Sequence, residues 1–236
     1  MNVQVLGSGS SGNAYIIDDG TTRILIEAGL PFNLLMKRAG FKLPRFCFIT
    51  HEHKDHSKAF KELARHGKRV FASHGTFEAL GGEDIDGVDF VRVSHGQTVQ
   101  AGSFNVMGFD TEHDVAEPLG FVFASRETGE QVLFATDTYF IRSQFKNISH
   151  FLIECNFSRE DFSEDVSDIV IERALESHFS LEDLVLFFQK TDLSKAEKIF
   201  LLHLSENNLD SMRAKKTIQE TTGVPTYLCK RQGGFI

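Results

Sequence analysis

Residues 45–56 read RFCFITHEHKDH, an apolar run followed at once by four side chains of the types that bind metal ions. The apolar run, RFCFIT, is typical of a strand buried on both faces. A strand end followed by a turn presents alternate side chains to one side of a crevice. His51 and His53 can therefore converge on one ion, while the turn carries Asp55 and His56 toward another. Imidazole and carboxylate suit zinc, manganese or iron, so the stretch predicts a metal site.

Three further residues stand in similar settings later in the chain. His113 lies in FDTEHD, Asp137 in LFATDT and His203 in IFLLHLS, each just after an apolar run of strand length. Polar ligand types that each end an apolar strand are expected where strands deliver side chains to one rim of a sheet. An aspartate in such a place can bridge two cations, because its charge offsets part of their repulsion.

Hydrophobic patterning predicts an α/β chain in which two sheets are enclosed by helices. Strands are expected at residues 3–6, 14–17, 23–26, 45–50, 70–72, 90–93, 98–101, 104–110, 120–124, 131–135, 151–154, 198–202 and 226–229. Helices are expected at residues 33–39, 57–67 with Ser57 as N-cap, 163–176, 180–189 opened by Ser180 and Asp183, and 209–221. No linker or internal repeat interrupts this order, so we expect a single domain over residues 1–236.

Composition narrows the function classes. The 236 residues carry a formal net charge of −8, which argues against a surface that binds nucleic acid indiscriminately but leaves a local basic track open. Much of the negative charge lies in stretches such as 160–168, away from the motifs in sequence. Three widely spaced cysteines suggest no disulfide framework. Neither a signal peptide nor a membrane-spanning run is visible, so a cytoplasmic protein without membrane contact is expected.

Together these residues resemble the metallo-β-lactamase superfamily, whose signature H-x-H-x-D-H matches residues 51–56. The resemblance implies an αββα sandwich that holds two divalent metal ions, zinc or manganese, with iron as a further option. It implies that His51, His53 and His113 hold the first ion, that Asp55, His56 and His203 hold the second, and that Asp137 bridges them.

Other stretches are similar to the WalJ/YycJ-type branch, namely LGSGSSGNAYII, FDTEHDVAEPLGF, LFATDTY and HLSENN. This implies a phosphodiesterase acting on nucleic acid, in particular a 5′→3′ exonuclease on DNA, with RNA or a small phosphodiester as other substrates; a homodimer is left open. SHFS at 177–180 resembles a further piece of the branch. Glu27 stands where the branch has Asp, and Phe157 where it has His. The separation of 66 positions from Asp137 to His203 leaves no room for a β-CASP-type insertion.

The residues allow a hydrolytic mechanism. Two cations about 3.5–4 Å apart lower the pKa of a shared water toward 7, so a bridging hydroxide can attack phosphorus. Asp55 would orient this nucleophile, and His178 would bind the phosphate or protonate the leaving oxygen. Asn13 either contacts substrate or serves the tight turn around it. Lys58 and Lys61 either form a solvated face or guide a DNA backbone to the site.

Two other function classes compete with a nuclease. A small-molecule hydrolase of the same fold, such as a cyclic-nucleotide phosphodiesterase, thioesterase or lactonase, would use the same metal ligands. The SGSSGN loop, SHFS and the basic helix favour phosphate. A non-catalytic scaffold is disfavoured, because all seven ligand positions are intact.

Overall fold

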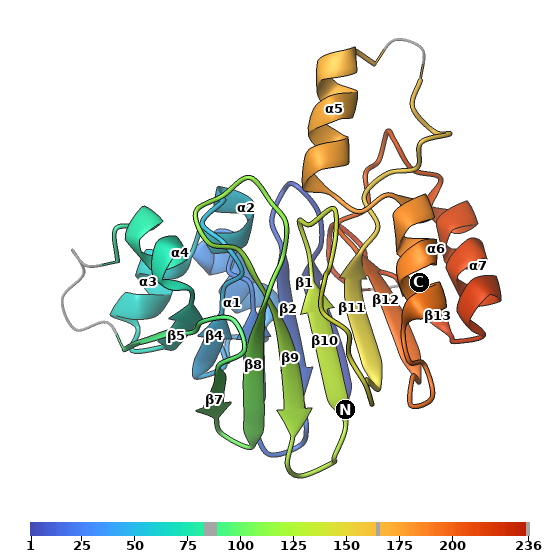
Figure 1. The fold of residues 1–236 in the computed structure, drawn as a ribbon. Coiled ribbons are helices and arrows are strands. Elements are labelled where there is room, and N and C mark those ends of the chain that lie inside the picture. The colour runs from blue at the N-terminus through green and yellow to red at the C-terminus, as the bar shows by residue number, and fades with distance from the viewer. Residues whose placement is uncertain (83–88, 164–165, 235–236) are drawn as a thin grey trace.

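Two β-sheets pack face to face between helices in this computed structural model, which describes residues 1–82, 89–163 and 166–234 (Figure 1). The first sheet has the order β1 (Asn2–Gly7), β2 (Ala14–Asp18), β3 (Arg23–Ile26), β4 (Phe46–Phe48), β5 (Arg69–Ala72), β6 (Phe90–Arg92). The second has the order β13 (Thr226–Leu228), β12 (Lys198–Leu202), β11 (His150–Glu154), β10 (Gln131–Ala135), β9 (Leu119–Ser125), β8 (Phe104–Asp110), β7 (Thr98–Ala101). The predicted αββα sandwich is confirmed.

In each sheet the strands that come first in the chain pair antiparallel, and the strands that come later pair parallel. In the first sheet the pairs from β3 to β6 are parallel, and in the second sheet those from β10 to β13 are parallel. β8 also runs in the direction of β10, because both are antiparallel to β9. The carboxyl ends of these strands lie at one rim of the sandwich, the usual place for ligands in α/β sheets.

The hydrophobic core has three layers. The layer between the sheets is rich in phenylalanine, and the rings of Phe48 and Phe71 stack at 4.3 Å between centroids. A second layer joins the first sheet to helices that include α3, through Phe60 and Leu63. A third joins the second sheet to α6 and α7, through Phe188 and other side chains. The helices are α1 (Phe32–Arg38), α2 (Lys54–Ser57), α3 (Phe60–Arg65), α4 (His74–Ala79), α5 (Asp168–Ser177), α6 (Leu181–Lys190) and α7 (Ser211–Thr222).

Most predicted elements are found within one or two residues of their expected bounds, but several differ. The helix expected at 57–67 is two helices: α2 begins inside the HEHKDH motif, α3 follows after Ala59, and Ser57 is not an N-cap. The Ser57 hydroxyl instead donates to the carbonyl oxygens of Glu52 and His53, which holds the turn that carries the motif. The strand expected at 45–50 is shortened to Phe46–Phe48 because the chain leaves the sheet to reach the rim.

The other differences and agreements concern where helices begin. α4 was not expected in a stretch that reads as strands; the Ser73 hydroxyl accepts from the amide of Thr76 and starts it. α5 begins only at Asp168, and residues 164–165 of its predicted range lie outside the described residues. Ser180 caps α6 as predicted, accepting from the Asp183 amide. No helix in the described ranges has the length and apolar character needed to span a membrane.

Candidate metal centre

The structure brings all seven predicted ligands to the rim, in two adjoining groups. Potential ligand atoms of one group lie within 4.8 Å of one another, and the same limit holds for the other group. The first group consists of His51, His53, His113 and Asp137, and the second of Asp55, His56 and His203. They come from the ends of strands in both sheets and from α2, so the rim is shared between the two halves of the sandwich.

Asp137 lies between the two groups. Its Oδ2 atom is 3.9 Å from Nε2 of both His51 and His113, and 3.4 Å from Nε2 of His56. Its Oδ1 atom is 3.3 Å from Nδ1 of His203. One carboxylate thus faces imidazoles of both groups, which is the placement expected of a bridging ligand.

Spacing and chemistry of the donors fit divalent ions. Metal–nitrogen bonds of about 2.0–2.1 Å in a tetrahedral site imply donors about 3.3–3.4 Å apart. Nδ1 of His53 lies 3.2 Å from Nε2 of His51 and 3.3 Å from Nε2 of His113. Nε2 of His203 is buried without a hydrogen-bond partner in the described part of the chain. A buried, unpaired ring nitrogen is costly, and a cation would satisfy it.

Glu27 orients two of these imidazoles from behind. Its fully buried carboxylate accepts a 2.5 Å hydrogen bond from the hydroxyl of Thr50, which lies 2.9 Å from Nδ1 of His51. The same carboxylate lies 3.4 Å from Nδ1 of His56. A carboxylate or hydroxyl at one ring nitrogen fixes the tautomer and leaves the other nitrogen free to bind metal. The longer side chain in place of Asp therefore reaches His51 only through the Thr50 hydroxyl, and it lies beside His56 without a hydrogen bond to Nδ1 in the described part of the chain.

Glu154 has the corresponding position behind the second group, and sequence reasoning missed it. Its Oε1 atom lies 2.8 Å from Nδ1 of His203 and 2.8 Å from Nδ1 of His178. Its Oε2 atom accepts from the amides of Thr138 and Phe179. Burial alone would raise the pKa of this carboxyl, but His178 and the other donors lower it. Glu154 ends an apolar strand just as the predicted ligands do, and this was the available signal.

The backbone is strained at three of these positions. Glu27, Asp137 and His203 have φ angles of 64°, 48° and 50°, in the left-handed region that non-glycine residues rarely adopt. Each follows the end of a strand, so the left-handed turn directs the side chain toward the rim. Such strain persists only where surrounding structure enforces it, and it concentrates at functional sites.

Electrostatics divide the imidazoles into two kinds. Burial lowers the pKa of His51 well below its ordinary value, and burial likewise lowers the pKa of His113. These rings are neutral and ready to bind metal. Burial would also lower the pKa of His203, but Asp137, Asp55 and Glu154 raise it to about 10. A metal ion at His203 therefore has to displace a proton.

The other predicted site residues have different surroundings. His178 lines a cavity beside His203, and its Nδ1 is engaged by Glu154, which leaves Nε2 free. Asn13 is completely buried and contacts the chain itself: its Nδ2 lies 3.1 Å from Nε2 of His56, and its Oδ1 accepts from the amide of Gly9. Its contact with substrate stays a prediction. Lys58 and Lys61 are exposed and form no ion pair with any described residue.

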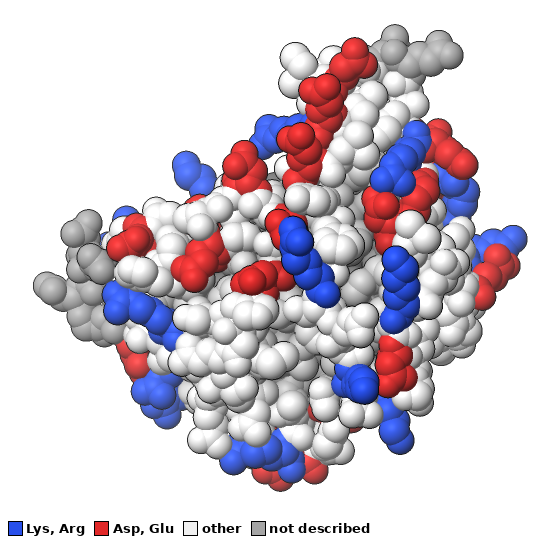
Figure 2. Space-filling model, viewed as in Figure 1, with Lys and Arg blue, Asp and Glu red and all other residues white. Residues whose placement is uncertain are grey.

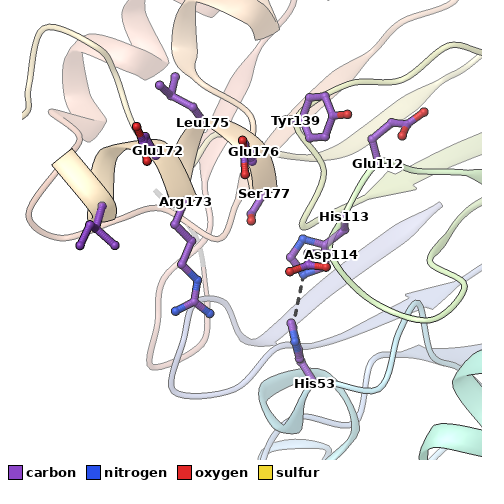
Figure 3. Close-up of a pocket in the computed structure, with 11 residues that line it drawn as sticks. His53, Glu112, His113, Asp114, Tyr139, Glu172, Arg173, Leu175, Glu176 and Ser177 are labelled. Atoms are coloured by element: carbon purple, nitrogen blue, oxygen red, sulfur yellow. Dashed lines mark hydrogen bonds between the residues drawn. The ribbon is translucent and has the colours of Figure 1, made fainter.

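A cavity of about 840 Å³ opens beside His53 and His113 under α5 (Figure 3). Four carboxylates line it against one arginine, Arg173; they belong to Glu112, Asp114, Glu172 and Glu176. Figure 2 shows acidic side chains along one side of α5. Glu172 and Glu176 of α5 therefore lie close to the candidate metal centre in space, although they are distant from the HEHKDH motif in sequence.

The fold and this site define a hydrolase class that uses divalent metal ions, and comparisons with known proteins agree. The family model described as a beta-lactamase superfamily domain matches residues 22–204. The chain therefore belongs to the beta-lactamase superfamily and is a metal-dependent hydrolase.

Two named relatives cover most of the chain. It is 28% identical over 231 residues to exodeoxyribonuclease YycJ of Bacillus anthracis, covering 90% of this chain and 86% of the relative. It is 28% identical over 226 residues to exodeoxyribonuclease WalJ of Streptococcus pneumoniae D39, covering 88% and 83%. Among solved structures, the metallo-β-lactamase fold protein YhfI of Bacillus subtilis matches with a TM-score of 0.75 at 16% identity, covering 99% of this chain and 98% of that one. The last match shows the fold alone.

Proposed function

We propose that the chain is a phosphodiesterase with two divalent metal ions, zinc or manganese, that degrades nucleic acid, and specifically a 5′→3′ exonuclease on DNA. The observation that carries the proposal is the placement of the Asp137 carboxylate between two groups of potential metal ligands. The printed names of the YycJ and WalJ relatives support the choice of DNA. We further propose that residues 1–236 form one domain without a β-CASP-type insertion.

The two ions, when bound, would supply charge stabilisation at the phosphate and a nucleophile at neutral pH. Asp55 is placed to orient that nucleophile. Its Oδ2 atom faces Nε2 of His56 at 3.4 Å and Nε2 of His203 at 3.7 Å, which leaves Oδ1 available. The Asp55 side chain is 27% exposed, so an attacking water can reach it.

In this proposal His178 protonates the leaving oxygen. Burial alone would lower the pKa of His178, but the carboxylate of Glu154 raises it above its ordinary value. Nδ1 of the ring is bound to Glu154, which leaves Nε2 free to donate. An imidazole that carries a proton at this position beside the metal ligands would be a suitable general acid.

A second candidate is a lactonase or thioesterase, and one observation favours it. An apolar groove of about 670 Å³ adjoins the acidic cavity, and Tyr139 and Leu175 line both. Phe140 and Leu186, each 50% exposed, extend the groove. An acyl chain would bury this apolar surface while its carbonyl carbon reached the rim.

One assay panel separates the candidates. Purified protein reconstituted with manganese or zinc is given 5′-phosphorylated duplex DNA, single-stranded DNA, RNA, a small phosphate bis-ester, an acyl lactone and a thioester. His113→Ala and Asp137→Ala serve as inactive controls. We expect DNA to be degraded by the wild type alone; cleavage of a lactone or thioester with no polynucleotide degraded would overturn the proposal.

A further inference from the structure

The loop of residues 111–118 joins β8 to β9 and carries His113 to the candidate metal centre without regular secondary structure. Within the described ranges, the buried Nδ1 atom of His113 has no hydrogen-bond partner, and its Nε2 atom faces His53 at 3.3 Å (Figure 3). By contrast, Glu154 lies 2.8 Å from Nδ1 of His203 and orients that ring from behind. The position of the His113 ring therefore depends on the backbone of its loop.

Two contacts join this loop to neighbours of other ligands. Near its start, the amide of Glu112 donates to the hydroxyl of Thr138 at 2.9 Å, and Thr138 directly follows Asp137. Near its end, the amide of Ala116 donates to Oε1 of Glu52 at 3.0 Å, and Glu52 lies within the HEHKDH motif. Both contacts lie on the side of the loop that faces the rim.

Glu117 holds the same loop to the first turn of α4. Its Oε2 atom accepts from the amide of Gly75 at 2.7 Å, and its backbone carbonyl oxygen accepts from the buried Ser73 hydroxyl at 2.6 Å. The first amides of a helix have no acceptor within the helix, so a carboxylate is a favourable partner for them. The Ser73 hydroxyl already accepts from the amide of Thr76, and Glu117 supplies the acceptor for Gly75.

Gly75 is the residue that lets the loop approach α4 this closely. Its φ angle is not positive, so its backbone conformation does not require glycine. A Cβ atom at Gly75 would lie 2.8 Å from the Cβ atom of Glu117 and 3.3 Å from that of Ala116. The first of these separations is too short for two carbon atoms, so any other residue at this position would push the loop away from the helix.

We propose that Glu117, through its contact with the first turn of α4, is a positioning residue for His113 and sets the affinity of the first ion. That ion is the one assigned to His51, His53 and His113, so this inference rests on the proposed function. Groups that orient metal ligands without touching the ion change its affinity by about 10- to 100-fold when they are removed. The ligands of the second ion belong to other segments, so its affinity should not depend on Glu117.

Calorimetric titration of the metal-free protein with zinc tests Glu117. We expect two binding steps in the wild type, and the step that is weakened in His113→Ala is that of the first ion. Glu117→Ala should weaken this step by about tenfold or more and leave the other within about twofold. Glu117→Gln keeps an oxygen that accepts from the Gly75 amide, so its first step should lie within about threefold of the wild type. The matched control Glu78→Ala removes an exposed carboxylate of the same helix and should leave both steps unchanged.

Gly75→Ala is a second test that removes no hydrogen bond. Alanine favours a helix over glycine and its amide still donates, so α4 itself is not weakened. The added methyl group should displace the loop and weaken the first ion by about tenfold, while the metal-free protein melts within a few degrees of the wild type. A merely structural role of this contact would lower the melting temperature and weaken both steps together. That result, or an unchanged first step in both Glu117→Ala and Gly75→Ala, would overturn the inference.

Failure of this inference and failure of the proposed function give different results. If the wild type degrades DNA but its first step does not depend on Glu117 or Gly75, the inference is wrong and the nuclease proposal stands. If the wild type binds two ions and degrades no polynucleotide, the nuclease proposal fails, and the titrations still decide the role of Glu117. If the wild type binds a single ion, the two-ion centre fails. The inference then stands only if the affinity of that ion falls about tenfold in Glu117→Ala.

Discussion

The two ends of the sandwich contain polar groups that differ in how far hydrogen bonds within the protein satisfy them. At the end away from the metal centre, Asp19 lies in the turn between β2 and β3 and accepts hydrogen bonds from Thr21 and Thr22 amides and from the Ser103 and Ser125 hydroxyls. This one carboxylate joins a hairpin of the first sheet to the turn between β7 and β8 and to the end of β9 in the second. At the rim, imidazoles face each other at 3.2–3.3 Å and the backbone is left-handed at Glu27, Asp137 and His203.

The difference separates groups that stabilise the fold from groups that are available to bind a metal ion. A fully satisfied carboxylate stabilises the packing of the sheets, whereas ligands without partners are held in place for something that binds them. Substitutions at the rim should therefore abolish hydrolysis with little change in stability. Substitutions at Asp19 should do the reverse.

The largest effect is expected for His113→Ala. Hydrolysis of the small bis-ester should fall by more than about 100-fold, because even loss of a group behind a ligand costs about 10- to 100-fold. The His113 Nδ1 atom has no hydrogen-bond partner in the described structure, so the variant should melt within a few degrees of the wild type. Rates and thermal melts measured together check this; an active variant would remove His113 from the site.

Loss of Glu154 should have the next largest effect. Glu154→Gln removes the charge that holds His178 and His203, so activity and metal affinity should fall by about 10- to 100-fold. The control is Glu182→Gln, since Glu182 accepts from the Ser158 hydroxyl away from the rim. Metal titration monitored by activity gives both quantities, and equal behaviour of the two variants would contradict the role given to Glu154.

Asp19→Asn tests the opposite end. We expect a loss of about 1–3 kcal/mol in the free energy of unfolding at neutral pH, with activity unchanged. Burial would raise the pKa of Asp19, but the hydrogen bonds from Ser103, Thr22 and Ser125 lower it. A carboxyl whose pKa is lower in the folded than in the unfolded state stabilises the fold at pH values above its unfolded-state pKa. This stabilisation is lost as the pH falls through the folded-state pKa. Denaturant unfolding should show the difference between wild type and variant shrinking as the solution becomes acidic; a constant difference would contradict the account.

The smallest effect is expected on the exposed surface beside the rim. Reversal of charge in the double variant Lys58→Glu/Lys61→Glu should weaken binding of single-stranded DNA and flatten its salt dependence, by about one unit of slope for each cation removed. Lys215→Glu/Lys216→Glu on α7 is the matched control. Fluorescence anisotropy over a range of salt concentrations measures both slopes. Identical slopes would show that Lys58 and Lys61 form only a solvated face.

The sequence predicts the ligands well because each of them is next to an apolar strand or in one dense motif. Glu154 follows the same rule, but its role depends on the pairing of β10 with β11, where Ala135 lies opposite Ile153 and thus sets Glu154 beside the start of the Asp137 turn. Local pattern alone does not fix that register.

Long-range packing explains the other differences. The acidic wall of the cavity beside His53 and His113 depends on where α5 lies relative to the rim, and nothing in residues 168–177 encodes that position locally. Asn13 sits in a loop whose composition suits both a substrate contact and a turn, and its burial against His56 depends on packing that the local sequence does not encode. Likewise, Arg231 donates to the hydroxyl of Ser11, which lies 220 residues earlier in the chain.

Metal content per chain tests the central claim most directly. Wild-type protein is loaded with manganese or zinc, freed of excess ion by gel filtration and analysed by mass spectrometry of the metal. The account predicts two ions per chain in the wild type and fewer than two in Asp137→Ala, because Asp137 faces both ligand groups. One ion or none in the wild type, or two ions retained by Asp137→Ala, would contradict a bridged pair of metal ions at this rim.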